Sequence, residues 1–105
     1  MTEEWRAVPE FEGFYEVSNL GMIRSVGRKV KRGSRMLTVN GRIICGSAAG
    51  KGYRKIILCR NGKQTHRYIH NIVLEAFVAP RSEGMEAAHG NGIRHDNRLS
   101  NLRWD

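Results

Sequence analysis

The residues best suited to chemistry gather in the stretch AAHGNGIRHDNRLSNLRWD, residues 87–105. It holds two histidines and three asparagines, with Asp96 among them. A hydrophobic core has no use for such a cluster, and a solvated tail would not carry Leu99, Leu102 and Trp104. An imidazole can take a proton from water, and asparagine amides can hold a loop in place beside it. The stretch therefore indicates that some of its polar side chains are being positioned, and the rest of the chain suggests what they act on.

Positive charge is concentrated in the middle of the chain. The formal net charge is +8, yet no acidic residue occurs between Glu16 and Glu75. That interval carries +13, and its flanks together carry −5. Self-repulsion would destabilise such a stretch unless it faces a polyanion. An anionic membrane fits less well, because the interval has no continuous amphipathic helix. The charge pattern predicts a nucleic-acid partner.

Ten basic residues of this interval are expected to contact the phosphate backbone rather than to read base sequence. They are Arg24, Arg28, Lys29, Lys31, Arg32, Arg35, Lys51, Arg54, Lys55 and Arg67.

Length and composition limit the other possibilities. The 105 residues suffice for one domain, or for two very small modules that share a core. Cys45 and Cys59 make neither a disulfide framework nor a zinc ligand set, which favours a reducing compartment. No apolar run approaches the roughly 20 residues of a membrane span, and the first residues, MTEEWRAVPEF, lack a hydrophobic signal core. We expect a cytoplasmic protein with no membrane partner.

The second half of the chain predicts one hairpin and one helix. Residues 53–60 and 64–70 flank Asn61-Gly62-Lys63, which is typical of a β-hairpin. Apolar residues at helical spacing predict a short amphipathic helix over 70–78, and Ala79-Pro80 should end it. The fold class predicted is α+β, with small antiparallel hairpins and one helix.

The first half predicts further short strands. Residues 15–26 should form two strands with a turn at Asn19-Leu20-Gly21. The basic segment 27–35 has few apolar residues and is expected to be a mobile loop. Asn40-Gly41 lies between two short apolar runs and predicts another hairpin. The glycine-rich segment 46–52 is expected to be a flexible connector.

The closing stretch resembles the HNH nucleases, also called His-Me finger or ββα-metal endonucleases, in the branch common among phage and intron-homing enzymes. Their usual pattern is H-x-D-G-N-x-x-N-N-x-x-x-N-L-x-W. The chain matches it without a gap at His89, Gly92, Asp96-Asn97, Asn101-Leu102 and Trp104. The preceding residues 53–78 also look like the hairpin and helix that come before this motif in the same branch.

A second resemblance covers EEWRAVPEFEGFYEVSNLGMIRSV, residues 3–26. It is similar to the nuclease-associated modular DNA-binding motif found ahead of such HNH domains. The matching residues are Trp5, Pro9, Glu12, Gly13, Tyr15, Val17, Ser18, Gly21, Arg24 and Ser25. The two resemblances imply a DNA-binding region with its basic loop over residues 1–50 and an HNH nuclease domain over 51–105.

The resemblance implies a DNA endonuclease that hydrolyses phosphodiester bonds of double-stranded DNA with one divalent ion, Mg²⁺ or Mn²⁺. His89 would be the general base. Asn101 would brace the loop and orient His89 or the metal, and Asn97 would fix the turn. The metal-ligand candidates are Asn101, Asp96 and Asn91. A phage-encoded enzyme of this kind would act in the host cytoplasm.

Three departures from the family pattern leave an alternative open. Ala88 stands where relatives have a metal-binding side chain before the leading histidine, and Asn91 replaces an acid. The closing helix of the ββα unit does not follow Trp104, so the His-Me finger is expected to be truncated. The alternative is a catalytically degenerate DNA-binding protein derived from an HNH nuclease.

Overall fold

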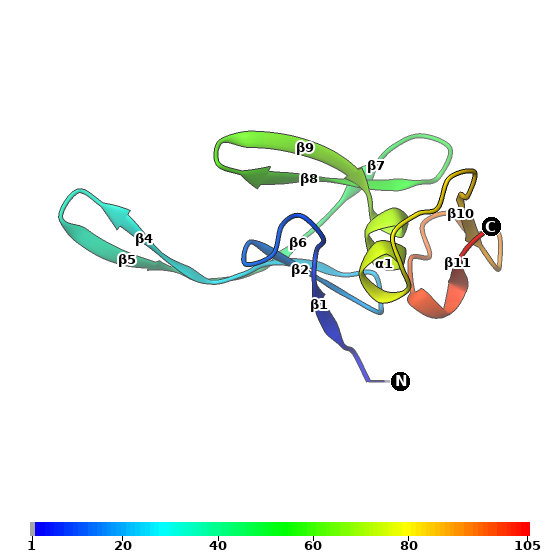
Figure 1. Ribbon diagram of the computed structural model, residues 1–105, viewed down its shortest axis with the longest axis horizontal. Helices are drawn as coiled ribbons and strands as arrows, with labels where there is room; N and C mark the ends of the chain where they lie inside the picture. The colour runs from blue at the N-terminus through cyan, green and yellow to red at the C-terminus, as the bar shows by residue number, and fades with distance from the viewer. Residues whose placement is uncertain (1) are drawn as a thin grey trace.

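Four small antiparallel sheets and one α-helix make up the computed structural model (Figure 1). It describes residues 2–105, and for Val30 only the backbone. The strands are β1 (Trp5–Ala7), β2 (Tyr15–Ser18), β3 (Ile23–Ser25), β4 (Arg28–Arg32), β5 (Arg35–Val39), β6 (Ile43–Ile44), β7 (Ser47–Ala48), β8 (Arg54–Arg60), β9 (Lys63–Tyr68), β10 (Ala87–His89) and β11 (Leu102–Trp104). The helix α1 spans Ile69–Phe77, and a 3₁₀ turn, η1, spans Leu99–Asn101. The predicted α+β class with small antiparallel sheets and one helix is confirmed for the described residues.

The β8–β9 hairpin is confirmed where the sequence predicted it. Asn61 and Gly62 connect the strands with φ values of 53° and 78°. Both values are positive, as the tight turns that match strand twist require, and asparagine and glycine adopt them at little cost. Strand β9 leads directly into α1, so the register of this hairpin also fixes where the helix starts.

Two predictions for residues 27–45 were wrong. The basic segment 27–35 is not a loop, because β4 pairs with β5 across a turn at Gly33 (φ 62°). Asn40-Gly41 does not make a hairpin, since β6 pairs with β3 instead. A Cβ on Gly41 would lie 2.4 Å from the carbonyl oxygen of Ser25, so this glycine permits two backbone segments to pass close together.

The β4–β5 hairpin forms an arm that extends away from the rest of the molecule (Figure 1). The molecule measures 51 × 29 × 24 Å, with the arm along its longest dimension. Every described side chain of β5 is exposed. The predicted connector 46–52 is also partly ordered, because β7 adds to the edge of β8. We refer to residues 28–39 below as the arm.

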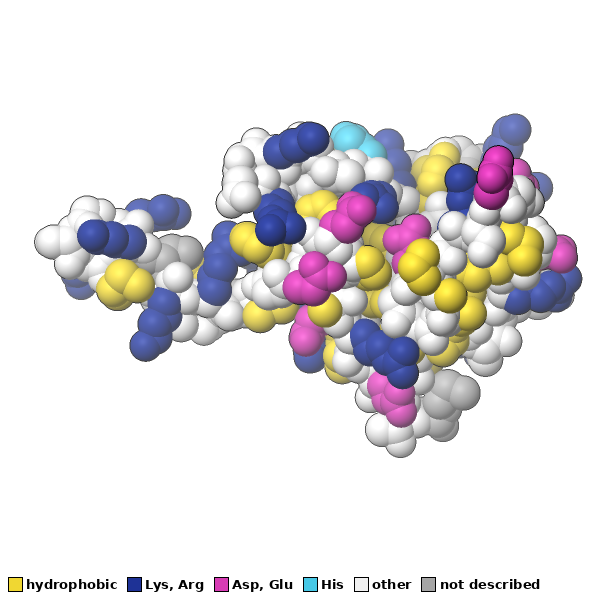
Figure 2. Space-filling model, viewed as in Figure 1, with side chains coloured by type: hydrophobic (Ala, Val, Ile, Leu, Met, Phe, Trp, Pro, Cys, Tyr) yellow, Lys and Arg dark blue, Asp and Glu magenta, His cyan; other side chains and the backbone are white. Residues whose placement is uncertain are grey.

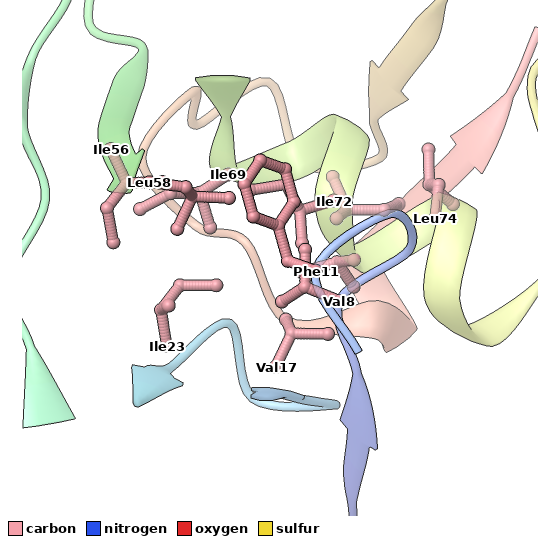
Figure 3. Close-up of a cluster of buried hydrophobic side chains, with 11 residues drawn as sticks. Val8, Phe11, Val17, Ile23, Ile56, Leu58, Ile69, Ile72 and Leu74 are labelled. Carbon is pink, nitrogen blue, oxygen red and sulfur yellow. The ribbon is translucent and has the colours of Figure 1, made fainter. Parts of the chain in front are cut away.

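One hydrophobic core joins the two halves of the chain (Figure 3). Val8, Phe11, Val17 and Ile23 come from the first half, and they pack with residues of β8, α1 and β11. The partners from the second half are Ile56, Leu58, Ile69, Ile72, Val73, Leu74 and Leu102. The buried face of α1 explains its apolar periodicity. Within residues 2–105, no helix has the length and apolar character needed to cross a membrane.

Candidate active site

His89 is the last residue of β10, at the end of a two-stranded sheet. Its backbone partner on β11 is Leu102, which is buried in the core. The far end of β11 is held by the Trp104 indole, whose Nε1 donates to the carbonyl of Ala79 at 2.9 Å. The hairpin is thus fixed at both ends, and His89 stands where the chain leaves the sheet.

Asn101 braces the loop that follows His89. Its Oδ1 accepts a hydrogen bond from the backbone N–H of Asn91 at 2.9 Å, and its Nδ2 donates to the carbonyl of Asp96 at 2.9 Å. The backbone carbonyl of Asn101 also accepts from the N–H of Gly90 at 2.7 Å. One residue therefore holds both ends of the loop.

We expect Asn101→Ala to lower the free energy of unfolding by about 1–3 kcal/mol, because partly buried loop groups lose their partners. Urea unfolding followed by circular dichroism measures this change. Ser100→Ala is the matched control, since Ser100 is the exposed neighbour in η1. Equal stability of the two variants would contradict the bracing role.

Asn97 orients the imidazole of His89. His89 Nε2 lies 3.1 Å from Oδ1 of Asn97, a side chain that is only 6% exposed. A carboxamide oxygen can only accept a hydrogen bond, so Nε2 must donate. The neutral imidazole then keeps its lone pair on Nδ1. This geometry leaves Nδ1 of His89 as the nitrogen able to take a proton.

A cluster of rings forms one wall beside His89. The ring centroid of His70 lies 5.2 Å from that of His89, and the ring of Tyr53 lies 6.0 Å from it. His70 is buried, and its Nδ1 has no hydrogen-bond partner among the described residues. Burial, with a smaller effect of the neighbouring His89, lowers the pKa of His70 to about 4. His70 is therefore neutral near pH 7 and adds no charge to the site.

Sequence reasoning did not connect this ring cluster with His89. Tyr53 directly precedes β8, Tyr68 ends β9 and His70 lies in α1, all far from residue 89 in the chain. They meet because β8 and β9 pair with Lys55 opposite Tyr68, and because α1 packs against β10. The available sequence signal was the concentration of rings around the β9–α1 junction.

The three predicted metal ligands lie together, but they bind one another. The Nδ2 of Asn91 donates to Oδ2 of Asp96 at 2.9 Å, while its Oδ1 accepts from the N–H of Ile93. The Arg98 guanidinium donates to both Asp96 oxygens, at 2.8 and 2.7 Å, and holds the pKa of that carboxyl well below its usual range.

A divalent ion such as Mg²⁺ needs free oxygen ligands, commonly carboxylates. Here the only carboxylate of the set is engaged by Arg98. Within residues 2–105, no group of three or more His, Cys, Asp or Glu side chains is arranged to hold a metal. The described residues do not by themselves fit a divalent ion. The assignment of Asn101, Asp96 and Asn91 as metal ligands stays a prediction.

The ten predicted DNA-contact residues fall into two groups. Three are engaged within the protein: Arg24 pairs with Glu16 and lies over the Trp5 ring, Arg54 donates to the carbonyl of Gly46, and Arg67 pairs with Glu10. Seven have no ion pair among the described residues, namely Arg28, Lys29, Lys31, Arg32, Arg35, Lys51 and Lys55. Five of these seven lie on the arm.

Comparison with known proteins gives two family matches. Residues 3–59 match the NUMOD4 motif, and residues 67–104 match the HNH endonuclease family. The chain is 29% identical over 101 residues to DNA endonuclease I-HmuI of Bacillus phage SP01, which covers 96% of this chain and 51% of the relative.

The fold comparison agrees with the sequence comparison. A solved structure described as "DNA binding and cleavage by the HNH homing endonuclease I-HmuI" superposes with a TM-score of 0.77 at 29% identity. It covers 97% of this chain and 52% of the solved chain, so the present chain spans about half the length of this relative. The motif order and the fold agree, and the chain belongs to the NUMOD4 family and carries an HNH endonuclease domain.

Proposed function

We propose that the chain forms the DNA-binding and cleavage region of a DNA endonuclease, in which His89 is the general base. The observation that carries the proposal is the Nε2 contact of His89 with Asn97, which leaves Nδ1 free to accept a proton. Hydrolysis of a phosphodiester needs such a base to activate the attacking water. The similarity to I-HmuI, named a DNA endonuclease, supports the same activity here.

The roles of the chain's own residues follow from this assignment. Asn97 holds the tautomer of His89, and Asn101 holds the loop that carries Asn97. HNH nucleases generally use a divalent metal ion, and we propose Mg²⁺ or Mn²⁺ as the ion that the activity requires. We further propose a DNA-binding region over residues 1–50, a nuclease domain over 51–105, and action in the cytoplasm of a phage host.

We assign the contact with double-stranded DNA mainly to the arm. Its visible surface is rich in Lys and Arg, while acidic side chains are seen on the body of the molecule (Figure 2). Arg32 and Arg35 are direct cross-strand partners on either side of the turn. Like charges at such positions destabilise a hairpin. A phosphate backbone between or beside them would relieve that repulsion, and a two-stranded ribbon is narrow enough to enter the major groove.

We expect the double variant Arg32→Gln/Arg35→Gln to weaken duplex binding and to reduce its salt dependence. The slope of log K against log salt concentration is negative, and each lost phosphate contact reduces its magnitude by about 0.9, so the double variant should have a slope shallower by about 1.8. Fluorescence anisotropy with a labelled duplex at several salt concentrations measures it.

Arg24→Gln is the control for this experiment, because the Arg24 side chain is already paired with Glu16. We expect a change of slope for Arg24→Gln that is less than half of the change for the double variant. A slope that the arm variant leaves unchanged would contradict the arm as the phosphate-binding surface.

The activity is tested by nicking of a supercoiled plasmid in Mg²⁺ or Mn²⁺, with a gel shift on the same DNA. Nicking supports the endonuclease. Binding without nicking in either metal would instead favour the degenerate DNA-binding protein, which the similarity to a DNA endonuclease does not favour.

A further inference from the structure

A pocket of about 270 Å³ is lined in part by Tyr53 and His70, the two rings that lie next to the ring of His89. Its lining residues are Tyr53, Tyr68, His70, Asn71, Arg81, Glu86 and Ala87. Ala87 and His89 are two residues apart on β10, so their side chains lie on the same face of the sheet. The pocket therefore opens on the face of β10 from which His89 projects.

Tyr68 is the most distinctive side chain of this pocket. It is 44% exposed, although it occupies the junction between β9 and the helix whose next residues, Ile69 and His70, are buried. The rings of Tyr68 and His70 are stacked, with centroids 5.1 Å apart and an interplanar angle of 21°. The ring of Tyr53 meets that of Tyr68 edge-on at 6.0 Å. Tyr68 is thus supported by other rings and still presents surface to solvent.

The rest of the lining suits the other parts of a nucleotide. Arg81 is an exposed cation at the rim, which can meet a phosphate. The amide of Asn71 and the carboxylate of Glu86 can hydrogen-bond the edge of a base. A pocket of this size lies just below the range of about 300–1,000 Å³ that holds drug-sized ligands, so its occupant should be a single small ring system.

We propose that this pocket receives one unstacked nucleotide of the DNA, whose base stacks on Tyr68 next to the phosphodiester that His89 acts on. The inference rests on the proposed endonuclease function and adds a substrate subsite to it. Aromatic side chains commonly hold bases that have left the duplex stack, because every base has a π face. Unstacking costs least for a base that is already unpaired.

The test is binding in a chelator-containing buffer, so that cleavage plays no part. Two labelled duplexes are compared by fluorescence anisotropy, one fully paired and one with a single central unpaired nucleotide. We expect the protein to prefer the bulged duplex by roughly 5- to 150-fold, the range that one base–aromatic stack gives. Tyr68→Leu should remove the preference, whereas Tyr68→Phe, which retains the ring, should keep it.

Arg81→Gln provides a second variant at an exposed position. It should lower the affinity for the bulged duplex more than that for the paired one. Equal binding of both duplexes by the unaltered protein, or a preference that survives in Tyr68→Leu, would overturn the subsite while leaving the proposed function intact. Failure to bind either duplex would overturn the proposed function as well.

Discussion

We expect His89→Ala to reduce the rate of plasmid nicking by about 10²- to 10⁴-fold, the usual contribution of a positioned general base. The imidazole that can take the proton from the attacking water is lost, and among the described residues no other hydrogen bond joins a side chain to Asn97 Oδ1. The affinity for duplex DNA should stay nearly unchanged, because the seven basic residues without ion pairs lie elsewhere. Initial nicking rates and gel shifts on the same plasmid separate the two effects.

His66→Ala is the control for the loss of a histidine. His66 is exposed on β9 opposite Ile57 and has no hydrogen bond or ring contact with the site. The His66→Ala variant should nick the plasmid at the rate of the unaltered protein. If His89→Ala retains full activity, or if both variants lose it equally, the assignment of His89 as the base is wrong.

The second large effect is expected far from residue 89 in the sequence, at Gly21. A Cβ at this position would lie 2.8 Å from the backbone oxygen of Asn97 and 2.9 Å from its Cβ, and Gly21 has a φ of +83°. The same turn directly holds the loop between β10 and β11, because the N–H of Leu99 donates to the carbonyl of Asn19 at 2.7 Å. Gly21→Ala must therefore displace Asn97.

Displacement of Asn97 should turn the imidazole of His89 away from its working orientation. Misplacement of a catalytic group by about 1 Å can cost about 10²-fold in rate, and we expect a loss of nicking of that order. Gly13→Ala is the matched control, because Gly13 has nearly the same φ, +82°, and no heavy atom within 4 Å of the added Cβ. Comparable losses in both variants would show that backbone strain, and not contact with Asn97, is responsible.

Local signals explain what the sequence could predict of the fold. The β8–β9 hairpin depends on Asn61-Gly62, whose positive φ values belong to the turn itself. Helix α1 depends on apolar periodicity that one short segment contains. At the arm the sequence predicts a loop because the segment is basic and poor in apolar residues, whereas β4 and β5 pair through their backbones and need no buried face.

Asn40-Gly41 shows the limit of the same reasoning. The dipeptide is a strong hairpin signal. Here, however, the glycine is needed because the backbone of residue 41 passes close to that of Ser25. Only the tertiary pairing of β6 with β3 distinguishes the two uses. No property of residues 40 and 41 alone could have done so.

The candidate site likewise has features that local spacing predicts and features that depend on long-range packing. His89, Asn97 and Asn101 lie within thirteen residues, so their spacing already indicated that they meet. The contact of Gly21 with Asn97 and the ring wall of Tyr53 and His70 depend on long-range packing, and no spacing rule contains them. The ion pair of Asp96 with Arg98 could not be predicted either, because nearness in the sequence does not show which group a carboxylate faces.

The most direct test of the central claim is the nicking of supercoiled plasmid by the unaltered chain, with Mg²⁺ or Mn²⁺ and with chelator, beside a gel shift on the same DNA. The account predicts salt-sensitive binding in all three conditions and relaxed plasmid only where a divalent ion is present. Tight binding with the plasmid still supercoiled in both metals would contradict it.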